Sequence, residues 1–154
     1  MATFSNYTVA KELAGVDTIN NNPYTIDSSL FRDPIRIGTG AGSLVQGQQS
    51  IAIGKDCGQT QGDYDTAVGS QCGKSSGGAT VSVGFGAGST LQSFEATAVG
   101  FEAGSISAGS GSVAVGANSG AINHGLGAVS VGNNSAYIDS GIYSISIGHN
   151  ACTT

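Results

Sequence analysis

The stretch Ser112-Val113-Ala114-Val115-Gly116-Ala117-Asn118-Ser119-Gly120 is one copy of a phrase that decides the fold of this chain. The phrase is a β-branched residue, a mostly small residue, a second β-branched residue and a glycine. It appears eight times, with its glycines 15 or 16 residues apart. So short and regular a period is typical of a solenoid, in which each repeat is one coil stacked on its neighbour. The predicted corner glycines are Gly38, Gly54, Gly69, Gly84, Gly100, Gly116, Gly132 and Gly148.

Each phrase fits a short β-strand, because alternate side chains of a strand point to opposite faces. The β-branched residues would occupy one face and Ala or Ser the other. Three residues after each glycine stands a further small residue, and six of the eight coils then carry a second glycine. We expect a second, shorter strand to follow, and its strongest candidates are Ser105-Ile106, Ala121-Ile122 and Tyr137-Ile138.

The predicted architecture is therefore an all-β parallel β-roll over residues 35–154, preceded by a segment without repeats over residues 1–34. Eight coils spaced by about 4.8 Å would form a rod roughly 35–40 Å long. The first segment has too many apolar residues for a linker and too few for a core of its own. We expect it to cap the roll or attach it to another protein, with a short helix near residues 7–13.

Composition excludes several classes of function. Charged residues make up 10% of the 154 residues, the net charge is −5, and Lys and Arg form no cluster. Binding to nucleic acids or to anionic membranes would therefore lack its electrostatic basis. No segment approaches the roughly 20 apolar residues of a membrane helix. The first residues lack the pattern of a signal peptide, so the three cysteines are expected as reduced thiols.

The width of the coil predicts an assembly. A coil of 15 or 16 residues has a thin interior that Ala, Ser and the small residue after each corner can fill. The Val and Ile rows would then form an apolar stripe outside, larger than monomers usually expose. Closed cyclic symmetry would bury such a stripe. The alternative is that Val and Ile fill the roll and Ala and Ser lie outside. The predicted interface residues are Ile37, Ile51, Ile53, Val68, Val81, Val83, Val99, Val113, Val115, Val129, Val131, Ile145 and Ile147.

The phrases Ser112–Ser119 and Ser50–Gly54 resemble the YadA-like head repeat of trimeric autotransporter adhesins. The resemblance covers Ile35 to Thr154. It implies a left-handed parallel β-roll assembled as a parallel homotrimer, with the Val and Ile strands facing the three-fold axis. It also implies a non-enzymatic role, because those adhesins use the head to attach to host surfaces.

That family also has a secretory signal, a coiled-coil stalk and a membrane barrel, none of which is seen in these residues. Similar repeats occur in fibres and spikes of bacteriophages and large DNA viruses, which are made in a host cytosol. We therefore expect a fibre or spike on the virion surface, with residues 1–34 bound to a capsid or tail protein. Contact with a host receptor or glycan is a further expected role. The alternative is the head of a bacterial adhesin at the cell surface.

Two glycine-rich loops, Gly38–Gly42 and Gly84–Gly88, resemble loops that cradle phosphate. Such a loop needs a following helix whose N-terminus holds the phosphate, and none is expected after either loop. Asp63, Asp65 and Glu95 lie in connections, where carboxylates are usually solvated, and no base or nucleophile accompanies them. We predict no catalytic residue and no cofactor.

Cys57 and Cys72 hold the same place in consecutive coils and should stack as small buried thiols, with a disulfide as the alternative. His149 and Cys152 lie close in sequence, but a metal needs three or four ligands, so we predict no metal site.

The aromatic residues Phe85 and Phe101 follow corners of consecutive coils, and Phe94 lies between them in sequence. We expect them to be buried, for instance at a subunit seam, while an outer patch that contacts a receptor or glycan is the alternative. Ice binding is disfavoured, because the positions after the corners form no row of threonines.

Overall fold

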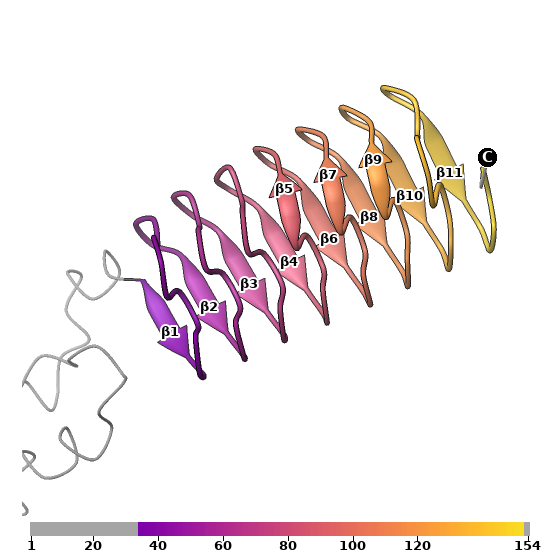
Figure 1. Ribbon diagram of the computed structural model, residues 1–154. Helices are drawn as coiled ribbons and strands as arrows, with labels where there is room; N and C mark the ends of the chain where they lie inside the picture. The colour runs from indigo at the N-terminus through magenta and orange to yellow at the C-terminus, as the bar shows by residue number, and fades with distance from the viewer. Residues whose placement is uncertain (1–33, 153–154) are drawn as a thin grey trace, which may run out of the picture.

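The chain forms a parallel β-solenoid in a computed structural model that describes residues 34–152. The coils stack in one direction into an elongated rod, with the first coil at one end and the carboxy terminus at the other (Figure 1). No helix occurs within these residues, which agrees with the predicted all-β class. Residues 1–33, with the predicted short helix and most of the predicted attachment segment, lie outside the described part.

One long sheet runs the length of the rod. Its eight strands are paired in parallel and in chain order, and each begins at the first residue of the repeat phrase. The first and third residues of each strand pair with their counterparts in the next coil, so every row of side chains runs along the rod. The strands are β1 (Ile35–Ile37), β2 (Ile51–Ile53), β3 (Thr66–Val68), β4 (Val81–Val83), β6 (Thr97–Val99), β8 (Val113–Val115), β10 (Val129–Val131) and β11 (Ile145–Ile147).

A second sheet is confined to the later coils. It contains β5 (Thr90–Gln92), β7 (Ile106–Ala108) and β9 (Ile122–His124), again parallel. Two of the three predicted second strands are confirmed as β7 and β9. The third is reduced to a single bridge between Ile122 and Ile138, and β5 is an addition that the sequence did not predict. The eight strands of the long sheet thus bound seven complete coils, with an eighth begun by β11.

The interior is thin and made of small side chains. The middle residues of the long-sheet strands β2 to β11 are buried, and so are the small residues three positions after most corners. Among residues 34–152, the buried apolar side chains are all alanine or cysteine. The prediction that Ala, Ser and the residue after the corner fill the roll is therefore confirmed, and the opposite arrangement is wrong.

The corners are stacked as closely as the strands. All eight corner glycines have φ between 121° and 142°, a region that side chains rarely adopt. The backbone N–H of Gly54 donates to the carbonyl of Ile37 at 2.7 Å, and that of Asp56 donates to Thr39 at 2.9 Å. The hydrogen-bond ladder therefore continues from the strands around the corner, which holds the outer side chains in register from coil to coil.

Candidate functional surfaces

The Val and Ile rows lie on the outer face of the long sheet. Within a strand such as β8 the middle residue Ala114 is buried, while Val113 and Val115 on either side are only half-buried. The exposed fraction is largest at the ends of the rod, where it reaches 53% for Ile37 and 71% for Ile145. All thirteen predicted interface residues share this face of the single chain. Ile35, which the sequence analysis did not include, lies in the same rows and is 48% exposed.

The phenylalanines at the corners are exposed in the single chain. Phe85 and Phe101 stack on each other with ring centroids 5.5 Å apart and an angle of 12° between the planes. Their exposed fractions are 45% and 50%, and Phe94 is 63% exposed. The predicted burial is therefore not provided by the other residues of the described part, 34–152. Phe94 lies against Gly77 and Gly78 rather than in the stacked pair.

Three asparagines form a row along the rod, here called the asparagine ladder: Asn118, Asn134 and Asn150. Each lies two residues after the corner glycine of its own coil, and the three coils are consecutive. Asn118 Nδ2 donates to Asn134 Oδ1 at 3.3 Å, and Asn134 Nδ2 donates to Asn150 Oδ1 at 3.2 Å. All three have φ of 53–54°, a left-handed conformation that asparagine tolerates better than most residues. This ladder was not predicted from the sequence, although asparagine recurs at the same offset from Gly116, Gly132 and Gly148.

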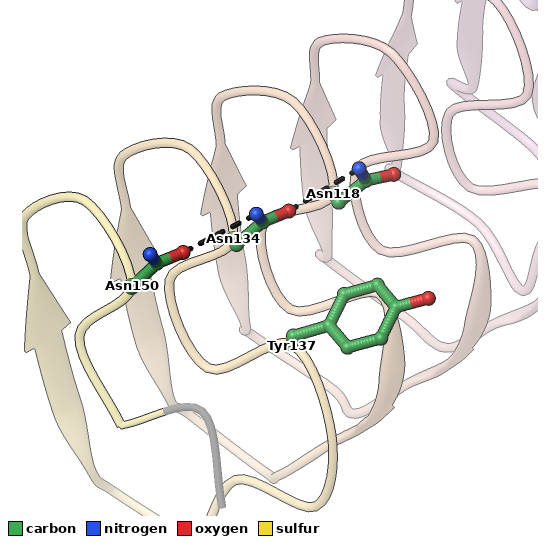
Figure 2. Close-up of a pocket in the computed structure, with 4 residues that line it drawn as sticks. All are labelled: Asn118, Asn134, Tyr137 and Asn150. Atoms are coloured by element: carbon green, nitrogen blue, oxygen red, sulfur yellow. Dashed lines mark hydrogen bonds between the residues drawn. The ribbon is translucent and has the colours of Figure 1, made fainter.

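The ladder forms one side of an open pocket of about 440 Å³. Tyr137 lines its other side, and its ring extends along the rod toward the coil that carries Asn118 (Figure 2). Tyr137 is 38% exposed. None of the lining residues carries a carboxylate, an amine or a guanidinium group, so the pocket is polar and uncharged.

Asp65 corrects an expectation about the carboxylates. It lies just before β3 and is fully buried, whereas Asp63 and Glu95 are exposed as predicted. Its oxygens accept hydrogen bonds from Gly62 N at 2.7 Å, from Thr80 N at 2.8 Å and from Thr80 Oγ1 at 2.7 Å. Ser76 Oγ also donates to it. The carboxylate is enclosed because its four donors replace the water it would lose.

Cys57 and Cys72 stack in neighbouring coils as expected, but the structure joins them in a disulfide rather than leaving two thiols. Their Cα atoms are 4.8 Å apart, which is the spacing of adjacent coils. Cys152 is free and exposed, and His149 Nε2 lies 3.0 Å from Asn150 Nδ2. Within the described residues, no three His, Cys, Asp or Glu side chains lie close enough together to hold a metal.

His124 is a buried polar residue that was likewise not predicted from the sequence. Its Nε2 lies 2.8 Å from Ser130 Oγ in the next coil, while Nδ1 has no hydrogen-bond partner. Loss of solvation on burial lowers the pKa of His124 below 6.5. Gln61 and Gln92 are buried at equivalent places in earlier coils, which was the available signal that this position faces the interior.

Both glycine-rich loops lie on corners of the roll, and no helix follows either of them in residues 34–152. That described part of the chain likewise contains no helix long and apolar enough to cross a membrane.

Comparisons of the chain with family models, with curated proteins and with solved structures find no match. The surfaces described above are therefore the basis for a functional proposal.

Proposed function

We propose that this chain is the rod of a homotrimeric fibre or spike on the surface of a virus or phage particle. Its role is structural and adhesive rather than enzymatic. Residues 1–34 attach the rod to a capsid or tail protein, and the rod projects to contact a host surface. The repeat that resembles the YadA-like head supports the left-handed, parallel three-fold arrangement.

The observation that carries this proposal is the outer row of half-buried Val and Ile side chains. Complete burial of such a side chain contributes about 1.5–3 kcal/mol relative to full exposure. In β2 to β10 these side chains are already mostly buried, so covering the rest contributes up to about a third as much for each. More than a dozen residues lie along this one face, and the burial of each would favour assembly. Since small side chains already fill the roll, a second part of the same coil cannot cover this face. A partner with a matching rod can cover it.

The first experiment is the mass of the purified protein in solution by light scattering. We expect about three times the 15.1 kDa of one chain. A monomer at neutral pH would contradict the trimer.

The substitution Val115→Asp tests which face is the interface. Val115 points away from the core, so the coil should still form, but the buried charge should abolish assembly. The matched control is Asn133→Asp, which adds the same charge at an exposed corner without changing the side-chain shape. Trimers that survive Val115→Asp would show that the Val and Ile face is not the interface.

A second candidate is the head of an exported bacterial adhesin. The disulfide between Cys57 and Cys72 favours it, because disulfides persist in oxidising compartments and are rare in the cytosol. Mass spectrometry of the protein taken from its native source, after alkylation without reduction, separates the candidates. If Cys57 and Cys72 of cell-surface protein are not alkylated, because they form the disulfide, the result supports the adhesin. If both are alkylated in particle-associated protein, the result supports the virion fibre.

A further inference from the structure

The geometry points to a binding site for a neutral saccharide in the pocket between the asparagine ladder and Tyr137. The biological use of this site rests on the attachment role proposed above, but its chemistry does not. A sugar ring presents hydroxyl groups at its edge and C–H groups on its face. The pocket offers a partner for each of these: amides on one side and an aromatic ring on the other (Figure 2).

The ladder has hydrogen-bonding capacity left for a ligand. Each side-chain amide carries two N–H donors and an oxygen with two acceptor sites. The bonds from Asn118 to Asn134 and from Asn134 to Asn150 use one donor of each donating amide and one acceptor site of each accepting oxygen, and Asn150 Nδ2 also lies 3.0 Å from His149 Nε2. The remaining donors and acceptors alternate along the rod at the spacing of the coils. Hydroxyl groups both donate and accept, so they match such an array better than a ligand that only accepts.

The backbone holds the ladder in place. The N–H groups of Asn118 and Asn134 donate to Phe101 and Ala117 of the preceding coils at 2.8 and 2.9 Å. Their side chains are bonded to each other as well, so little freedom remains to be lost when a ligand binds. The amides are therefore preorganised, which favours binding to a small neutral molecule.

Tyr137 provides the opposite wall. The face of its ring carries negative charge density, which attracts the slightly positive C–H groups of a sugar. The position that Tyr137 occupies in its coil is held one coil earlier by Ala121, whose short side chain leaves room for the ring to extend along the rod. Tyr137 is also paired with that coil, because the Ile122 N–H donates to its carbonyl at 3.0 Å.

The absence of charge in the pocket selects the class of ligand. Phosphate, sulfate and sialic acid need a cation or several convergent donors, and no Lys or Arg lines the site. A purely apolar ligand would leave the amides without partners. The volume of about 440 Å³ suits one or two sugar rings and lies within the range of small-molecule sites.

The site is local rather than a general property of the repeat. At the ladder position the other coils carry Gly40, Asp56, Gln71, Gly86 and Glu102, and at the Tyr137 position they carry small or flexible residues. Residues that other coils carry at the same positions can therefore be used as substitutions in the pocket. Asn134→Gly keeps the left-handed backbone, as Gly86 does, and Tyr137→Ser copies Ser105 of an earlier coil.

The test is saturation-transfer NMR on the full chain with glucose, galactose, mannose, N-acetylglucosamine, lactose and cellobiose. We expect transfer to at least one of these sugars, with shifts of the Asn134 side-chain amide signal. Binding should weaken at least tenfold in Asn134→Gly and in Tyr137→Ser, and persist in Tyr137→Phe. The matched control is Tyr143→Ser, which removes an exposed tyrosine of the same coil region outside the pocket.

No transfer to any sugar of the panel would overturn the proposal, and so would transfer that survives both pocket substitutions. Shifts of the Asn134 amide with a glutamine-rich peptide, but with no sugar, would assign the pocket to protein binding instead. The mass measurement is independent of these results. A trimer that binds no sugar contradicts the site alone, whereas a monomer that binds sugar contradicts the trimeric fibre alone.

Discussion

At the scale of single residues, the corner glycines determine how closely coils can stack. Gly100 has φ of 136°, and a Cβ atom there would lie 2.5 Å from the carbonyl oxygen of Gly116 in the next coil. The N–H groups of Gly100 and Gly116 donate to Val83 and Val99 of the preceding coils at 2.8 Å each, so neither glycine can move without opening this ladder of backbone hydrogen bonds. The glycine is needed for its conformation and also for the absence of a side chain.

Gly100→Ala should therefore destabilise the roll. The backbone conformation alone costs about 1–3 kcal/mol for a residue other than glycine, and the steric clash adds to it. We expect the melting temperature to fall by at least about 5 °C. Gly141→Ala is the control, because its Cβ would meet no atom within 4 Å and its φ is not in the left-handed region. Equal melting of the two variants would contradict the role of the corner.

His124 makes the stability of the later coils depend on pH. Burial lowers the pKa of the folded residue below 6.5, while the unfolded residue keeps a value near 6.5. Above that pH both states are neutral and the stability is complete. As the pH falls below about 6.5, the unfolded chain binds a proton first, so the free energy of unfolding decreases until the folded pKa is passed. The neighbouring strands β7, β8 and β10 carry no titratable group, and Asp139 nearby is exposed.

His124→Gln should remove this dependence, since Gln92 occupies the equivalent place in an earlier coil. Melting temperatures measured between about pH 7.5 and pH 5 should decline more steeply for the native chain than for the variant. Carboxylates titrate equally in both, so the difference reports His124. Parallel curves would contradict the assignment.

At the scale of elements, the contacts between coils differ along the rod. On their second side the early coils form isolated β-bridges, such as Thr60 with Ser75, and single backbone hydrogen bonds, such as Gln61 N to Val45 O at 2.9 Å, whereas β5, β7 and β9 form a sheet later. The early coils have other links instead. The disulfide between Cys57 and Cys72 joins two neighbouring coils, and Gln46 Nε2 donates a hydrogen bond to Gln61 Oε1 at 2.9 Å.

Asp65 is the strongest polar link between these coils, because it joins its own turn to Thr80 just before β4. Asp65→Ala would leave the Gly62 and Thr80 N–H groups without partners in a buried place. We expect a loss of about 3 kcal/mol or more in denaturant unfolding, since bonds to charged groups contribute about 1.5–3 kcal/mol each. Asp63→Ala, at an exposed site with one bond to Gln48 N, should cost less than about 1 kcal/mol. Equal losses would contradict the special role of Asp65.

At the scale of the whole molecule, the rod has two different long surfaces. The Val and Ile face runs from β1 to β11 and is apolar except for Thr66 and Thr97, while the corners carry a changing sequence that ends in the asparagine ladder. This division suits an assembled fibre, in which the uniform face serves the partner subunits and the variable edge serves recognition.

If the uniform face holds a trimer together, unfolding should depend on protein concentration. The melting temperature of the native chain should rise with concentration, because association stabilises only the folded state. Val115→Asp should melt lower and at a temperature independent of concentration. Calorimetry over a hundredfold range of concentration measures both. A concentration-independent native transition would contradict assembly through this face.

The sequence by itself determined the solenoid, its period, the corner positions and the small residues of the core. A glycine phrase repeated every 15 or 16 residues leaves only one register in which like residues stack, and this explains why eight parallel strands were predictable. It also indicated that Ala and Ser face inward, because a coil this narrow has no room for larger rows.

Only the tertiary structure decided which polar groups are enclosed and which side chains meet. Asp65 lies in a connection that resembles a solvated turn, and its burial depends on donors supplied by Thr80 in the next coil. The pocket likewise needs Tyr137 of one coil to lie beside amides of three coils. Contacts of this kind arise between residues far apart in the chain, so the phrase of a single coil does not contain them.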